Sequence, residues 1–176
     1  MKCTPTPERS ESEPCQDLHV VLVAPDIHWN TGNAGRTCLA AGAQLHLVRP
    51  LGFSLDDRYL RRAGLDYWPH VAPEVWPSWD AFAEALPGLG EPFLFSAEGQ
   101  KTLWDVAYPR RTVLVFGSET RGLPAPLRAR YRDRLLALPM RDGPVRSLNL
   151  STTVGIALFE VLRQRLPGSR EFSIET

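Results

Sequence analysis

The sequence predicts an α/β fold in which a mostly parallel sheet carries helices on both faces. Five short apolar runs are spread along the chain, and segments of helical length separate them. Such alternation is typical of parallel sheets, because each crossover between parallel strands needs a connection long enough to hold a helix. The chain has 176 residues, 43% of them hydrophobic and 23% charged. We therefore expect one domain with a single sizeable core.

The predicted strands are short apolar runs, as expected of strands buried in a parallel sheet. In chain order they lie near 18–23, 45–48, 92–96, 112–116 and 134–138.

The predicted helices fill the intervals between these runs, near 31–41, 56–63, 78–86, 124–131 and 149–165. Gly42 and Gly64 stand where glycine commonly ends a helix, and Ser78 is a suitable N-cap. Pro124 suits the first position of a helix. Apolar residues cover much of the last helix, with Ile156 and Phe159 widening the stripe, so we expect it to be packed on two sides. The main stripe is Leu150, Val154, Ala157, Leu158, Val161 and Leu162.

The two ends of the chain differ from the rest in composition. Residues 1–17 are rich in Pro, Ser, Glu and Thr, and we expect them to be disordered. Residues 167–176 are expected to be a loose tail, which leaves 18–166 as the folded domain. Without both tails the chain carries 17 basic and 14 acidic residues, a net charge of +3. This modest value means that any contact with RNA must rest on local clusters of charge.

Several classes of protein are disfavoured by composition. No apolar run approaches the ~20 residues needed to cross a bilayer, and the N-terminus has no apolar segment typical of a secretory signal. The expected location is the cytoplasm, with no membrane partner. Neither the three cysteines nor the four histidines are spaced as a metal site. Cys38 falls in a predicted helix and is interpreted as a small buried residue.

The middle of the chain holds a distinctive turn, Phe-Gly-Ser-Glu-Thr-Arg-Gly-Leu-Pro at residues 116–124. It follows an apolar strand and contains two glycines, which let backbone groups come close to a ligand. Glu119 and Arg121 supply opposite charges. A ligand-holding turn is the favoured interpretation, and a strand-to-helix connection with a surface ion pair is the alternative.

Two further stretches accompany this turn. Residues 24–37, Ala-Pro-Asp-Ile-His-Trp-Asn-Thr-Gly-Asn-Ala-Gly-Arg-Thr, follow the first strand, and Arg-Ser-Leu-Asn-Leu-Ser at 146–151 precedes the last helix. The three together resemble the signature motifs of the SPOUT superfamily of knotted RNA methyltransferases, closest to its SpoU branch. The run Arg-Arg-Ala-Gly-Leu-Asp-Tyr at 61–67 resembles the minimal TrmL type, which 2′-O-methylates the wobble nucleotide (position 34, cytidine or uridine) of tRNA.

The resemblance covers about residues 18–166 and implies a C-terminal deep trefoil knot and a homodimer. It implies tRNA as substrate and S-adenosylmethionine (SAM) as methyl donor, with no metal cofactor and no DNA partner. The homodimer would explain the wide apolar girth of the last helix, although a central place in the monomer would also do so. The residues implied to hold SAM are Phe95, Gly117, Leu138, Ser147 and Leu148. Those implied at the reaction centre are Arg36, Asn33, Glu119, Ser147 and Asn149.

Arg36 resembles the family arginine proposed to activate the 2′-hydroxyl. A guanidinium is almost never deprotonated in proteins, so positioning a phosphate or stabilising the forming alkoxide are equal alternatives. Asn30 and Asn33 could cap a helix, and the resemblance adds contact with RNA for Asn30.

For RNA binding, Arg58, Arg61 and Arg62 are predicted to share one helix face. Trp29 could stack on a base or cover the core. The alternatives to a wobble-nucleotide enzyme are methylation at another tRNA site or in rRNA, and a non-catalytic RNA-binding protein of this fold. An oxidoreductase is disfavoured, because no G-x-G-x-x-G follows the first strand.

Overall fold

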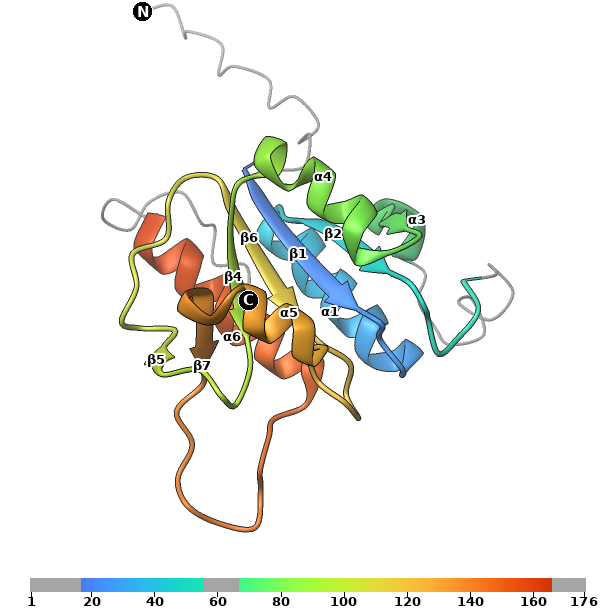
Figure 1. Ribbon diagram of the computed structural model, residues 1–176. Coiled ribbons are helices and arrows are strands. Elements are labelled where there is room, and N and C mark those ends of the chain that lie inside the picture. Colours follow the sequence, from blue (N-terminus) through green and yellow to red (C-terminus); the bar gives the residue numbers. More distant parts are fainter. Residues whose placement is uncertain (1–16, 56–66, 166–176) are drawn as a thin grey trace, which may run out of the picture.

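A seven-stranded sheet runs through the centre of the computed structural model, which describes residues 17–55 and 67–165 (Figure 1). All its strand pairs are parallel, and the strand order is β3-β2-β1-β6-β4-β7-β5. The predicted parallel α/β architecture is therefore confirmed. The strands are β1 (Leu18–Val23), β2 (Gln44–Val48), β3 (Glu74–Trp76), β4 (Glu91–Phe95), β5 (Lys101–Thr102), β6 (Thr112–Phe116) and β7 (Leu135–Ala137).

Helices cover both faces of this sheet and divide the core into two clusters. One face packs against α1 (His28–Ala41), α3 (Trp68–Val71) and α6 (Leu150–Arg165). The other packs against α4 (Trp79–Leu89) and α5 (Ala125–Arg130), which a short 3₁₀ turn, η1 (Arg132–Arg134), follows. The central strands β1 and β6 are buried along their whole length, as expected when helices lie on both sides of a parallel sheet.

The boundaries of these elements follow local signals with a few differences. Gly42 ends α1 in the left-handed conformation, and the Ser78 hydroxyl accepts a hydrogen bond from the Ala81 N–H at the start of α4. The helix predicted from residue 31 begins three residues earlier, at His28. Pro124 is the N-cap of α5 and not its first residue. Four short elements, α3, β3, β5 and η1, were not predicted, because two to four residues without a longer apolar run around them carry no readable periodicity. The predicted helix 56–63 and Gly64 lie outside the described residues.

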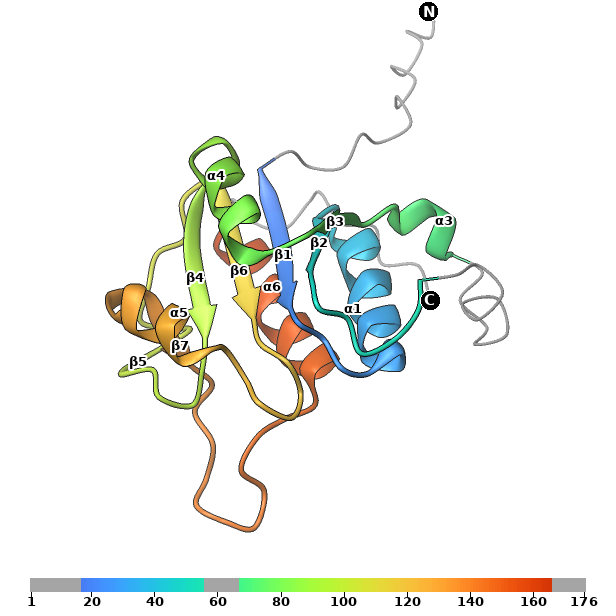
Figure 2. The same ribbon diagram turned by 45° about the vertical axis from the view of Figure 1, so that its right-hand side comes forward.

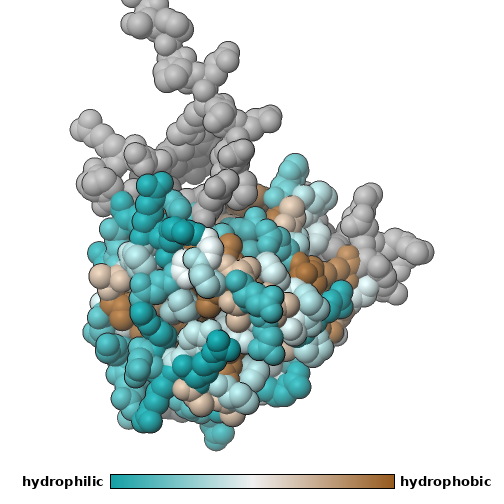
Figure 3. All heavy atoms as spheres, turned by 45° about the horizontal axis from the view of Figure 1, so that its top comes forward, coloured by the Kyte–Doolittle hydropathy of each residue, from teal (hydrophilic) through white to brown (hydrophobic). Residues whose placement is uncertain are grey.

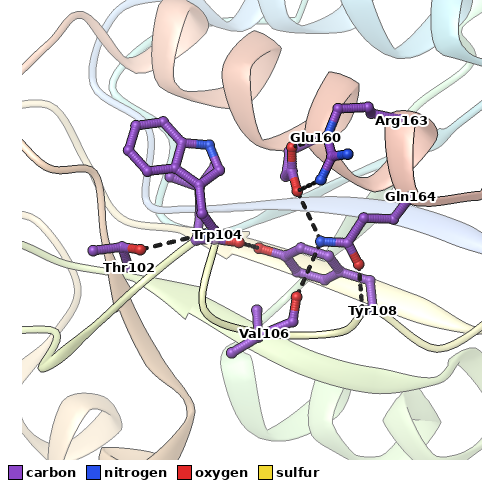
Figure 4. Close-up of polar contacts among 8 residues, drawn as sticks. Thr102, Trp104, Val106, Tyr108, Glu160, Arg163 and Gln164 are labelled. Carbon is purple, nitrogen blue, oxygen red and sulfur yellow. Dashed lines mark hydrogen bonds and ion pairs between the residues drawn. The ribbon is translucent and has the colours of Figure 1, made fainter.

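The last helix buries one side and exposes apolar residues on the other. Val154, Ala157 and Leu158 are fully buried, whereas Ile156 is 36% exposed and Phe159 54% exposed. Gln164 fastens this helix to the segment after β5, since its side chain accepts a hydrogen bond from the Tyr108 N–H and donates one to the Val106 carbonyl (Figure 4).

The outer surface is mainly polar where it can be seen in Figure 3, with small hydrophobic patches separated by hydrophilic residues. Within residues 17–55 and 67–165, no helix has the length and apolarity needed to span a bilayer.

Candidate active site

A cleft of about 820 Å³ opens at the carboxyl ends of the central strands. Its walls are the residues that follow β4, β6 and β7, together with the start of α1 and the start of α6. Ligands of open parallel sheets commonly bind at this edge, and the volume is typical of a cleft that holds a small organic molecule. Figure 2 shows the loops after β6 and β7 and the first turn of α1 at the same end of the sheet.

A chain of side-chain hydrogen bonds joins the three motifs at this cleft. The Asn30 amide donates to one Glu119 carboxylate oxygen at 2.9 Å, and the Asn149 amide donates to the Asn30 amide oxygen at 2.8 Å. The Asn149 oxygen in turn accepts from the backbone N–H and the hydroxyl of Ser151. Residues from β1–α1, β6–α5 and β7–α6 are thus connected directly, which fixes the relative positions of three separate loops.

Asp26 ties the first and second motifs together a second time. Its backbone N–H donates to the other Glu119 oxygen at 2.8 Å. Its carboxylate accepts from the Thr120 hydroxyl and pairs with Arg121 at 3.4 Å. The Thr120 hydrogen bond is the main cause that lowers the pKa of Asp26. The alternative surface ion pair between Glu119 and Arg121 is therefore not formed, because each of them has its partner in the first motif.

Gly117 is required by the turn itself. A Cβ at this position would lie 2.1 Å from the backbone carbon of Gly122 and from the Leu123 nitrogen. The backbone folds back on itself here through two hydrogen bonds between Ser118 and Gly122. Gly122 has a φ of +64°, the left-handed conformation that favours glycine. The chain therefore needs the space beside Gly117 for its own backbone.

Three arginines lie in the cleft wall, and sequence reasoning did not select them as site residues. Arg121 is held by Asp26, and Arg128 pairs with Glu98 at 3.0 Å. Arg146 lies on the exposed segment before α6. Asp26 was missed as well, although the sequence carried a signal for it. It lies three residues after β1, and the carboxyl ends of parallel strands meet at one edge of a sheet.

The predicted site residues fall into three groups in the structure. All five implied SAM contacts line the cleft, as do Glu119, Asn149 and Asn30: these are Phe95, Gly117, Leu138, Ser147, Leu148, Glu119, Asn149 and Asn30.

Asn33 and Arg36 do not line this cleft. Both are exposed on α1, and the Arg36 guanidinium lies 5.5 Å from the centre of the Tyr67 ring. The capping alternative for Asn30 and Asn33 is not seen, because Ile27 is the N-cap and no side chain caps α1. Arg58, Arg61 and Arg62 lie outside the described residues.

Cys38, His19 and His46 are buried in the fold. No group of three potential metal ligands occurs in residues 17–55 and 67–165. Burial raises the pKa of the Cys38 thiol, which keeps it protonated and unreactive.

His19 and His46 form a buried pair between β1 and β2, 3.0 Å apart. The Trp76 N–H donates to His46 Nδ1 at 3.1 Å. That nitrogen is therefore unprotonated, and His46 Nε2 donates to His19. Burial lowers the pKa of His46 to about 3. Glu74 lies 3.4 Å from the same nitrogen and would favour the charged ring, but its exposed carboxylate is screened by water, and the Trp76 hydrogen bond requires the neutral form.

Comparison with known proteins gives consistent matches over most of the chain. Residues 17–159 match the SpoU rRNA Methylase family. A tRNA (cytidine(34)-2'-O)-methyltransferase from Burkholderia ambifaria is 49% identical over 149 residues, which cover 84% of this chain and 95% of that protein. A solved structure described as giving insight into 2-OH methylation of C/U34 on tRNA is 49% identical, with a TM-score of 0.77 and coverage of 84% of this chain and 95% of the other. The structure of an AdoMet-bound rRNA methyltransferase from Sinorhizobium meliloti is 26% identical, with a TM-score of 0.69 and coverage of 87% and 61%.

Proposed function

The chain belongs to the SpoU rRNA methylase family, and from that premise we propose that it methylates the ribose 2′-hydroxyl of nucleotide 34 in tRNA, with SAM as methyl donor. The observation that carries the proposal is the hydrogen-bonded chain Glu119–Asn30–Asn149 in the wall of a single cleft. A relative that is 49% identical is named as a methyltransferase of cytidine 34 in tRNA. A solved structure, also 49% identical, is described as giving insight into 2-OH methylation of C/U34 on tRNA. Methylation of another tRNA site or of rRNA is the alternative reaction of the same cleft.

The residues of the cleft suit a donor with an adenosine end and an amino-acid end. Leu138 and Leu148 supply apolar surface that fits the flat faces of a purine, and the backbone after β4, β6 and β7 supplies polar groups. The cofactor would contribute a methyl group already activated on a sulfonium sulfur. The protein's task is then to hold the ribose hydroxyl in line with that methyl group. No metal is included in the proposal.

Glu119 is the carboxylate best placed to receive the ribose. Both its oxygens already accept one hydrogen bond each, from the Asp26 N–H and from Asn30. A carboxylate oxygen can accept a second hydrogen bond, so Glu119 can take one from a substrate hydroxyl while it stays fixed. Ser147 and Asn149, in the third motif, also line the cleft and complete its polar wall.

Arg36 and Asn33 need a second copy of the chain if they act in the reaction. They do not line the cleft of their own chain, and Arg36 lies against Tyr67. We therefore place them at the cleft of a partner copy in a homodimer. The exposed Ile156 and Phe159 of α6 supply an apolar face for that dimer.

The remaining parts of the proposal rest on family membership. We place the domain at residues 18–166, the deep trefoil knot at the last two motifs, and the protein in the cytoplasm, where tRNA is the partner. The hydrogen bonds that join three cleft loops at Asn30 support the part of this proposal that concerns the motifs.

One experiment tests the reaction and the site together. The protein is incubated with methyl-labelled SAM and bulk tRNA, and the methylated nucleoside is located by mass spectrometry of digested RNA. We expect 2′-O-methylcytidine or 2′-O-methyluridine at position 34. Label at another nucleotide would support the alternative substrate, and RNA binding without any label would leave a non-catalytic RNA-binding protein.

A subunit-mixing experiment tests the role of Arg36. Arg36→Ala and Glu119→Gln variants, each inactive alone, are unfolded together and refolded. If Arg36 acts at the partner's cleft, the mixture recovers about a quarter of the wild-type rate, because half of randomly paired dimers are mixed and each of these has one intact site. Action within one chain would leave the mixture inactive.

A further inference from the structure

Trp29 is a half-exposed tryptophan in the helix that contributes Asn30 to the cleft. Its side chain is 50% exposed in the first turn of α1. Asn30, the next residue, lines the cleft, as does Ile27 two residues before, whereas Trp29 itself lies outside the lining. Trp29 belongs to neither of the two core clusters. Of the two interpretations that the sequence left open, covering the core therefore does not describe this side chain.

One aromatic neighbour, His28, contacts the indole. The centres of the His28 and Trp29 rings are 4.5 Å apart, and the centre of the Phe53 ring is 6.3 Å from that of His28. Gly52, next to Phe53, packs directly on the Asp26 backbone, where a Cβ would come within 2.6 Å of the Asp26 oxygen. The loop that carries Phe53 is thus fitted closely against the first motif. An aromatic ring held in this way loses little conformational freedom when it contacts a ligand.

The same face of α1 carries groups that suit RNA. Trp29, Asn33 and Arg36 stand at i, i+4 and i+7, and all three are exposed. They offer an aromatic surface, an amide and a cation in one row.

We propose that Trp29 stacks on an unpaired base of the substrate RNA, next to the nucleotide whose ribose enters the cleft. The inference rests on the proposed function and adds to it the contact that holds the neighbouring base. Single-stranded RNA loops present unstacked bases, and proteins bind them by aromatic stacking, which is tolerant of base identity. Trp29 is thus a substrate-positioning residue, and it shares its helix face with Arg36.

The test compares tryptophans of similar exposure. Trp29→Ala, Trp29→Phe and, as the matched control, Trp104→Ala are prepared. Trp104 is 59% exposed, does not line the cleft, and lies in the segment after β5, where its backbone N–H donates to the Thr102 hydroxyl (Figure 4). Affinity for a stem-loop RNA with the sequence of a tRNA anticodon arm is measured in the presence of S-adenosylhomocysteine, which prevents turnover. We expect Trp29→Ala to weaken binding by about 5- to 100-fold, whereas Trp29→Phe and Trp104→Ala stay within about threefold.

A cycle with modified RNA identifies the stacked base. Stem-loops that carry an abasic site immediately before or after the target nucleotide are bound by wild type and by Trp29→Ala. One of these RNAs should bind wild type more weakly, and the Trp29→Ala variant should show no further loss with it, because the stacking contact is already gone. Additive losses for both RNAs would overturn the inference.

Two other outcomes separate this inference from its premise. If wild type methylates the stem-loop and Trp29→Ala binds and methylates it equally well, the stacking role is wrong and the proposed function stands. If wild type neither binds nor methylates RNA, both fall. Sedimentation of the same variants gives the last outcome: loss of self-association in Trp29→Ala, without an RNA effect in the dimeric fraction, would show that the indole contacts a second copy instead.

Discussion

The hydrogen bonds of Asn30 give the sharpest test of how the site is assembled. Asn30 is 7% exposed and bridges Glu119 and Asn149. Asn30→Ala removes one hydrogen bond to a charged group and one between neutral groups, and it leaves both partners with an unused polar atom. Net values of about 1.5–3 and 0.5–1.5 kcal/mol for the two kinds of bond, reduced because the cleft admits water, give an expected loss of about 2–3 kcal/mol in the free energy of unfolding. For a chain of this size the melting temperature should fall by about 4–12 °C.

Asn33 provides a matched control within the same helix. It is exposed, and Asn33→Ala changes the same residue type one turn away, so the gain in helix propensity is shared by both variants and cancels. We expect Asn33→Ala to unfold within about 0.5 kcal/mol of wild type. Urea unfolding followed by circular dichroism measures both variants, and SAM-saturated turnover with tRNA measures their activity. If Asn33 is catalytic, Asn33→Ala should lower the turnover rate without lowering the free energy of unfolding.

The reasoning would be refuted if Asn30→Ala and Asn33→Ala had equal stability. That result would mean that the bonds between the three motifs contribute nothing to holding the loops together. Asn30→Asp refines the test, since it keeps the shape of the side chain but places a second carboxylate beside Glu119. It should be at least as destabilising as Asn30→Ala at pH 7, and the difference between them should shrink as the solution is acidified toward the carboxylate range.

Three further predictions concern other parts of the molecule. Gly117→Ala places a Cβ 2.1 Å from backbone atoms of the same turn, so calorimetry should show at least a tenfold loss of affinity for S-adenosylhomocysteine, about 1.4 kcal/mol, whereas Gly88→Ala, with nothing within 4 Å, should bind as wild type does. The depressed pKa of His46, about 3 against an ordinary 6.5, means that the unfolded state binds the extra proton between those values. The contribution of His46 to the free energy of unfolding should therefore be constant above pH 7, and it should lower that free energy by up to about 1.4 kcal/mol per pH unit below about pH 6. His46→Asn, which keeps an acceptor for the Trp76 N–H, should flatten this slope between pH 4.5 and 6.5, and an unchanged slope would contradict the assignment. Phe159→Glu places a charge on the exposed face of α6. Sedimentation should show monomers at concentrations where wild type forms the proposed homodimer, with unfolding little changed, and an unaltered dimer would exclude this face as the interface.

The arrangement of the site depends on the helix register of α1, which the sequence signals placed too late. Asn and Gly at 30–32 suggested a capped start at residue 31, but α1 begins at His28 without a side-chain cap. Asn30 is consequently inside the first turn, where its amide faces the second and third motifs and not its own backbone. Local propensity favours a cap for Asn, and the tertiary contact with Glu119 outweighed it.

The sequence by itself determined the parallel α/β fold, the order of its main elements and the three motifs whose residues line the cleft. These are properties of apolar periodicity and of local residue types, which each segment carries alone. The tertiary structure decided that the Asp26 N–H and the Asn30 amide donate hydrogen bonds to Glu119. It also decided that Gly117 is needed by the turn itself, and that Arg36 and Trp29 face outward from α1. The hydrogen bonds of Glu119 with Asp26 and Asn30, and that of Asn149 with Asn30, join residues 89–119 positions apart. No local pattern encodes them, because they exist only where β1, β6 and α6 meet at one edge of the sheet.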